Sequence, residues 1–136
     1  MSNTATEARS VVVEREIPFP PEKIWRALTQ PHLIEEWLMK SDFKPVVDHR
    51  FNLHANWGTV DCQVLAVEPN KTLSYTWAAQ GLESVVIWTL TPTGTGTHLR
   101  MEQSGFRPDQ KQAYGGAKAG WPEFLAKLEQ VLAGTD

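Results

Sequence analysis

The stretch that decides the fold is residues 64–77, which read VLAVEPNKTLSYTW. Residues 68–72, EPNKT, combine residue types that favour turns, and an apolar run lies on each side of them. After the turn, every second residue is large and apolar: Leu73, Tyr75 and Trp77. This period of two is typical of a strand with one buried face, so the stretch predicts a β-hairpin.

The first strand of this hairpin carries an irregularity. Its alternation slips after Val64, where Leu65 and Val67 take over the apolar phase. One extra residue predicts a β-bulge, and a bulge bends and twists the strand that contains it. We therefore expect a strongly curved sheet.

The flanking sequence extends the sheet in both directions. Residues 50–55 alternate, residues 56–59 are expected to form a four-residue hairpin loop, and that register places Val60 opposite Ala55 and His54 opposite Asp61. Farther on, Tyr75 is expected opposite Trp88. Two inward-facing sets are then expected to pair across a loop that contains Gly94 and Gly96: Val86, Trp88 and Leu90 with Gln103, Met101 and Leu99.

Helical patterns surround this meander of strands. A β-branched strand at residues 11–17 precedes short helices at 22–28 and 32–38, each introduced by a proline. Near the C-terminus, Asp109 is expected to cap a long helix, with Gln112 completing a capping box. An apolar stripe marks this helix: Trp121, Phe124, Leu125, Leu128, Val131 and Leu132. Pro122 predicts a kink or break, and Gly134 fits the helix end.

The bulk properties bound the class of protein. The 136 residues fit one domain, which we place at 11–134 after an N-terminal tail at 1–10. A charge of −3 gives no basic surface for nucleic acid, and no apolar run could span a membrane. The single cysteine and the polar N-terminus favour a cytoplasmic protein.

At this point the sequence resembles the START-like (SRPBCC) superfamily, and within it the family related to the C-terminal domain of the Hsp90 ATPase activator (AHSA1-like). The matching segments are 17–29 (IPFPPEKIWRALT), 37–39 (WLM), 49–51 (HRF), 64–77, 104–106 (SGF) and 120–122 (GWP). The chain departs from the family pattern at Asp48, where glycine is usual, and at Gln103, where histidine is frequent. Asp tolerates the left-handed backbone that such a turn requires.

The resemblance implies an α+β helix-grip fold, in which a curved antiparallel sheet of about six strands wraps a long C-terminal helix. Two short helices would lie between strands one and two. Relatives bind lipids, polyketides and other hydrophobic molecules, or contact Hsp90, so the resemblance implies the fold more than the chemistry.

The residues themselves give little support for catalysis. The four histidines are scattered and have no metal-ligand spacing, so we expect no metal and no cofactor. Cys62 faces the core without a histidine on its face, which argues against a thiol nucleophile. Arg15 shares the apolar phase of its strand, and we expect a structural salt bridge with a carboxylate such as Glu36.

The six tryptophans leave a choice between a bulky core and an aromatic-walled pocket. We predict a pocket for a small hydrophobic molecule, aromatic or lipid-like, between the sheet and the C-terminal helix. Its expected lining is Trp37, Phe51, Leu53, Trp57, Tyr75, Trp77, Trp88, Met101, Gln103 and Trp121.

Three alternatives stay open. A cyclase or hydrolase would need a polar pair in the pocket, for which Gln103 and Tyr75 are the candidates, although we assign no catalytic residue. The chain could instead be a partner of an Hsp90-like chaperone, with a role in the stress response. It could also be a homodimer joined through tryptophans rather than a monomer.

Overall fold

The computed structural model describes residues 9–134. Within that range the chain forms a seven-stranded antiparallel sheet with the strand order β1-β7-β6-β5-β4-β3-β2. The strands are β1 (Arg9–Ile17), β2 (Lys40–Ser41), β3 (Arg50–Ala55), β4 (Gly58–Glu68), β5 (Thr72–Ala79), β6 (Leu82–Thr93) and β7 (Gly96–Phe106). The helices are α1 (Pro21–Thr29), α2 (Pro31–Trp37) and α3 (Lys111–Ala133). The α+β helix-grip architecture is confirmed.

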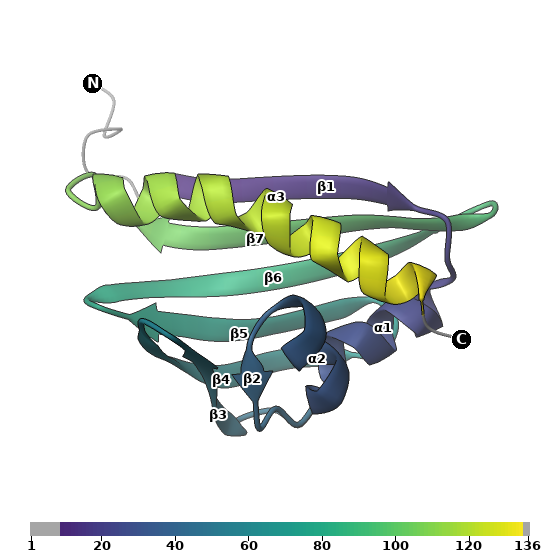
Figure 1. Ribbon diagram of the computed structural model, residues 1–136, viewed down its shortest axis with the longest axis horizontal. Helices are drawn as coiled ribbons and strands as arrows, with labels where there is room; N and C mark the ends of the chain where they lie inside the picture. The colour runs from purple at the N-terminus through teal and green to yellow at the C-terminus, as the bar shows by residue number, and fades with distance from the viewer. Residues whose placement is uncertain (1–8, 135–136) are drawn as a thin grey trace.

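Figure 1 shows how the layers are arranged. The long helix α3 crosses one face of the sheet, and its N-terminal half lies beside β1 and β7. Helices α1 and α2 lie near its C-terminal end, where both contact it. The core fills the space between the helices and the sheet, and on α3 the four buried residues are Trp121, Leu125, Leu128 and Leu132. Their spacing places them on one side of the helix, as the stripe predicts.

The sheet has one strand more than expected. The additional strand, β2, is two residues long and pairs with β3 through Lys40 opposite His54. Two residues are too few to show an alternation in the sequence, so this strand had no detectable pattern.

The predicted register of β3 and β4 is wrong by two residues. The turn contains only Asn56 and Trp57, and Ala55 lies opposite Gly58. His54 accordingly faces Thr59 rather than Asp61. A shift by two keeps every side chain on its predicted face, which is why the burial pattern was still correct.

The bulge in β4 is confirmed, since the pairing with β5 shifts between Val64 and Ala66. The residue between them, Leu65, is exposed, so the prediction that it turns inward is wrong. The extra residue of a bulge is left out of the ladder and points away from it. Nearby, Asp48 adopts a left-handed φ of 72°, as expected for the turn before β3.

The predicted pairings of the later strands have different outcomes, one wrong and one confirmed. Tyr75 lies opposite Val86 instead of the predicted Trp88, because the β5–β6 turn has only two residues, Gln80 and Gly81. The expected pairing of β6 with β7 is confirmed, with Trp88 opposite Met101.

Helix α3 differs from its predicted form at its start. Gln110 is the residue at the N-cap and makes no side-chain cap, while the Asp109 carboxylate lies 3.4 Å from Arg107. The predicted cap is therefore wrong. The helix also continues through Pro122 without a break, because buried residues on both sides of the proline pack against the same core.

Arg15 pairs with a different carboxylate from the predicted one. Its guanidinium lies 3.8 Å from Glu129 of α3, and the expected pair with Glu36 is not formed. Both side chains are more than a third exposed, so this is a surface ion pair with little effect on stability.

Candidate functional site

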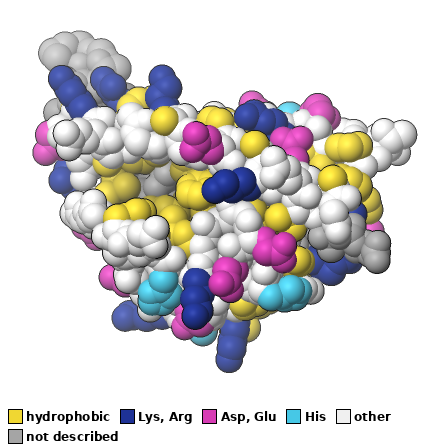
Figure 2. Space-filling view, in the orientation of Figure 1, with side chains coloured by type: hydrophobic (Ala, Val, Ile, Leu, Met, Phe, Trp, Pro, Cys, Tyr) yellow, Lys and Arg dark blue, Asp and Glu magenta, His cyan; other side chains and the backbone are white. Residues whose placement is uncertain are grey.

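A groove of about 560 Å³ opens between the N-terminal half of α3, the ends of β5 and β6, and the β3–β4 turn. Figure 2 shows this face of the molecule hollowed, with hydrophobic side chains inside the hollow. The lining residues are Met39, Trp57, Trp77, Ala79, Gln80, Leu82, Gln103, Gln112, Ala113, Gly116, Ala117, Gly120, Trp121 and Phe124. All of these residues are uncharged, so the groove presents a neutral surface.

Aromatic rings form much of the wall. Trp77 of β5 and Trp121 of α3 meet with their ring centroids 5.3 Å apart, and Phe124 packs against Trp121 at 5.5 Å. Trp57 lies in the β3–β4 turn and is 52% exposed. The half-exposed ring of Trp57 therefore lies at the edge of the groove.

Small residues on α3 keep the groove open. Ala113 and Ala117, and likewise Gly116 and Gly120, are one helical turn apart and all line it. A Cβ added to Gly116 would meet no atom within 4 Å. Larger side chains at these positions would occupy the space between α3 and the sheet.

Gln103 lies in the groove wall and is almost fully buried. Its side-chain oxygen accepts the indole N–H of Trp121 at 2.6 Å, and its amide nitrogen donates to Ser84 Oγ at 2.9 Å. Ser84 in turn donates to the carbonyl of Trp77 at 2.8 Å. This network orients the indole of Trp121 and links β7 to the backbone of β5 at Trp77, because its buried polar groups are all paired.

The predicted lining divides into two groups. Four residues line the groove: Trp57, Trp77, Gln103 and Trp121. Six others lie in the core and do not line it: Trp37, Phe51, Leu53, Tyr75, Trp88 and Met101. The tryptophans therefore form both a core and a pocket wall.

Trp37 and Trp88, two of the four buried tryptophans, illustrate the core role. Trp88 is fully buried, meets Trp37 edge to face at 5.6 Å, and donates its indole N–H to the Tyr75 hydroxyl at 3.0 Å. Trp37 donates to the carbonyl of Ala27 at 2.8 Å. With their polar groups satisfied inside the protein, these rings stabilise the fold.

Sequence reasoning missed most of the residues that α3 contributes to the groove. The spacing of Ala113 with Ala117 and of Gly116 with Gly120 was the available signal, since two pairs of small residues at i and i+4 mark a helix face of low volume. Met39 and Leu82 carried no such signal, because their place at the groove depends on the packing of distant strands.

Ionisable groups near the core are held neutral. Burial raises the pKa of the Cys62 thiol to about 12. Burial also raises the pKa of Tyr75, whose hydroxyl accepts from Trp88. Tyr75 and Gln103 belong to separate hydrogen-bond networks, so the two candidates for a catalytic pair do not act together in this arrangement.

Across residues 9–134, no cluster of three or more His, Cys, Asp or Glu side chains is arranged to hold a metal ion. None of the helices in this range combines the length and the apolar character needed to cross a membrane.

Several solved structures are similar to this chain. Protein MLL2253 from Mesorhizobium loti is 73% identical, with a TM-score of 0.90, over 94% of this chain and 99% of that one. DynU16, a protein in the dynemicin biosynthetic locus, is 27% identical with a TM-score of 0.81, over 91% of this chain and 47% of that one.

The Aha1 dimer from Colwellia psychrerythraea shares 22% identity, with a TM-score of 0.83 over 91% of this chain and 96% of that one, a likeness of fold alone. No curated protein matches the chain. Residues 18–133 match the family described as activator of Hsp90 ATPase homolog 1-like protein. The match spans α1 to the end of α3, and the chain belongs to this AHSA1-like family within the SRPBCC superfamily.

Proposed function

We propose that this protein binds a small, neutral, flat hydrophobic molecule in the groove beside the N-terminal half of α3. The observation that carries the proposal is the lining itself, which joins three tryptophans and Phe124 to uncharged polar side chains. A concave apolar site with a few polar groups is the usual composition of a small-molecule pocket.

The absence of charge in the lining favours neutral ligands. A carboxylate or sulfonate inside the groove would lose its hydration and meet no cation among the lining residues, which is strongly unfavourable. A flat apolar ligand instead gains about 25 cal/mol for each Å² of apolar area removed from water, before the costs of binding. Stacking on indole faces adds selectivity for planar rings.

DynU16, which is 27% identical, belongs to a biosynthetic locus. Its place there fits a fold used around small molecules, and an enzyme of the cyclase or hydrolase type stays an alternative for the same groove. That alternative needs a reactive polar pair, and Tyr75 and Gln103 are each bonded to other partners. Binding without chemistry therefore fits the side chains better.

A second candidate function follows from the family match. An activator of Hsp90 ATPase homolog acts with a chaperone, so contact with an Hsp90-like partner in a cytoplasmic stress response is the runner-up. The Aha1 protein that is 22% identical forms a dimer, so a homodimer of this chain remains an alternative to the monomer. Stimulation of ATP hydrolysis by a purified Hsp90-type chaperone would support this candidate.

The test of ligand binding compares two probes with the same aromatic skeleton. Neutral N-phenylnaphthylamine is titrated against its sulfonated analogue, anilinonaphthalene sulfonate, and probe fluorescence is measured. We expect saturable binding of the neutral probe and much weaker binding of the anionic one. Trp57→Ala should weaken binding of the neutral probe. Leu65→Ala, which changes another exposed apolar residue outside the groove lining, should leave that binding unchanged.

The proposal would be contradicted if the two probes bound equally well. It would also be contradicted if the Trp57→Ala variant bound the neutral probe as tightly as the unchanged protein does. If neither probe binds and the protein accelerates ATP hydrolysis by the chaperone, the second candidate takes its place.

A further inference from the structure

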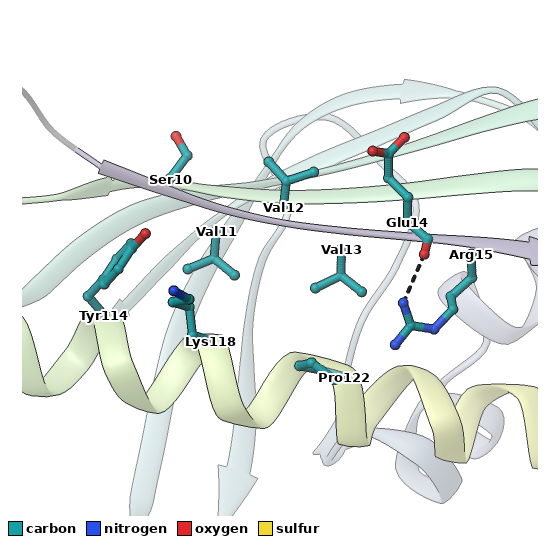
Figure 3. A pocket seen from close by; sticks show the side chains of 9 residues that line it. All are labelled: Ser10, Val11, Val12, Val13, Glu14, Arg15, Tyr114, Lys118 and Pro122. Carbon is teal, nitrogen blue, oxygen red and sulfur yellow. Dashed lines mark hydrogen bonds between the residues drawn. The ribbon is translucent and has the colours of Figure 1, made fainter.

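A second groove, of about 430 Å³, runs between β1 and α3 and is shown in Figure 3. It is lined by six consecutive strand residues, Ser10, Val11, Val12, Val13, Glu14 and Arg15, and by Tyr114, Lys118 and Pro122 of the helix. None of these nine residues lines the groove proposed above for a small molecule.

The strand presents its main chain to this groove. Successive side chains of a strand point to opposite faces, and in Figure 3 Val11 and Val13 point toward α3 whereas Val12 and Glu14 point away. Only the backbone edge can bring six consecutive residues to one groove. Among residues 9–134, β1 is the last strand of the sheet and pairs only with β7, so no other strand of this range lies beside its other edge.

One hydrogen bond identifies which backbone groups lie on this free edge. The carbonyl of Glu14 accepts from Arg15 Nη1 at 2.8 Å, so this oxygen points away from β7. In an antiparallel ladder the N–H and C=O of one residue point the same way, and alternate residues share that direction. Ser10 and Val12 therefore also present their backbone donors and acceptors to the free edge.

The side chains at the Tyr114 end of this edge are positive, whereas Arg15 at the other end is paired with Glu129 of α3. Arg9 and Lys118 both lie over the ring of Tyr114, at 5.5 and 5.7 Å from its centroid, and neither forms an ion pair with another residue of the described range 9–134. The Glu14 carboxylate is bonded to His98 on the opposite face of the sheet. An occupant of this edge would thus meet Arg9 and Lys118 where it passes Tyr114.

We propose that the groove between β1 and α3 binds an extended acidic peptide, which adds to the sheet as a strand beside β1. Main-chain hydrogen bonds to the residues of the free edge would hold the peptide, as in other cases of strand addition. Its acidic side chains would point toward Lys118 and Arg9. Apolar side chains at the alternate positions would lie beside Val12, which is 41% exposed.

The test uses a fluorescently labelled peptide of alternating Glu and Val, matched in length to β1, and measures its anisotropy. Saturable binding is expected, with a marked loss when Gln replaces Glu in the peptide. Methylation of alternate peptide nitrogens should abolish binding, because it removes the donors that strand addition requires. Lys118→Glu should weaken binding about tenfold, as expected for reversal of a charge at an interface.

The matched control is Lys127→Glu, which reverses another exposed lysine of the same helix outside the groove lining. This variant should bind the peptide as the unchanged protein does. Backbone amide shifts measured by NMR should change in residues 10–15 and around Tyr114, and remain constant at Trp57.

Three outcomes would overturn the proposal: no saturable binding at millimolar peptide, undiminished binding of the methylated peptide, or undiminished binding by the Lys118→Glu variant. A dimer that forms through β1 and excludes the peptide would assign the edge to a second copy of this chain. Light scattering over a range of protein concentrations would detect it.

Discussion

The indole N–H of Trp121 lies 2.6 Å from the side-chain oxygen of Gln103, in a buried hydrogen bond that joins α3 to β7. The helix and the strand meet here at the wall of the neutral groove. This polar contact therefore ties α3 to β7 and orients the indole of Trp121 in the wall of the groove.

Gln103→Leu should destabilise the protein by about 2 kcal/mol, because it leaves the buried N–H of Trp121 without an acceptor. Chemical unfolding monitored by circular dichroism measures the loss. Combining it with Trp121→Phe should cost less than the sum of the two single changes, since the second change removes the orphaned donor. Strict additivity would show that the hydrogen bond contributes nothing to stability.

Gly116→Leu should close the groove without unfolding the helix. We expect neutral-probe binding to weaken about tenfold, a change of about 1.4 kcal/mol. The neighbouring Gly115→Leu serves as the control, since Gly115 is exposed on the same helix and does not line the groove. Both changes raise helix propensity, so a binding loss confined to Gly116→Leu would be steric. Similar binding by the two variants would show that the probe lies elsewhere.

Gly96→Ala should destabilise the fold by about 1–3 kcal/mol, the usual cost of forcing extra atoms into a packed site. A Cβ at this position would lie 2.2 Å from the backbone oxygen of Ile17, which cannot move without disturbing β1. Gly94→Ala, in the same hairpin, has open space around its Cβ and should leave the unfolding midpoint nearly unchanged. Equal midpoints for the two variants would contradict the close approach.

The pKa of His98 should be raised above its ordinary value of about 6.5. The causes are the hydrogen bonds that the imidazolium donates to Glu16 and then to Glu14, which hold it between two carboxylates of β1. NMR titration of the imidazole measures this value, and Glu14→Gln combined with Glu16→Gln should lower it. An unchanged value in the double variant would contradict the assignment.

The contacts of His98 with Glu14 and Glu16 also predict how the stability of the protein changes with pH. Because the folded-state pKa is raised, the stabilisation is fully present below about pH 6.5 and is lost as pH rises through the folded-state value. Glu16→Gln should therefore lower the unfolding midpoint at about pH 6 more than at about pH 9. A larger effect at high pH would contradict this interpretation.

Cys62 should react slowly with thiol reagents in the folded protein. Burial raises its pKa to about 12, so at neutral pH the reactive thiolate is scarce as well as inaccessible. The chain has one cysteine, and the rate of labelling therefore reports this site alone. Denaturant should restore rapid labelling, whereas fast labelling under native conditions would show that the β4 face opens.

Local patterns were sufficient to predict most of the fold. The alternation around Trp77 and Trp88 identified the inner face of the sheet, and the slip after Val64 located the bulge. Turn lengths were harder to predict. Loops of two and four residues place the same side chains inward, so burial patterns cannot distinguish registers that differ by two.

The sequence by itself determined the strand and helix pattern, the apolar faces and the family. Which tryptophans fill the core and which face a groove was decided by the tertiary structure, because it depends on where a helix passes over a curved sheet. Trp88 lies in the core and is fully buried, whereas Trp77 and Trp121 line the groove together with the small residues of α3. Periodicity specifies the direction of a side chain, but the space in front of it is set by residues far away in the chain.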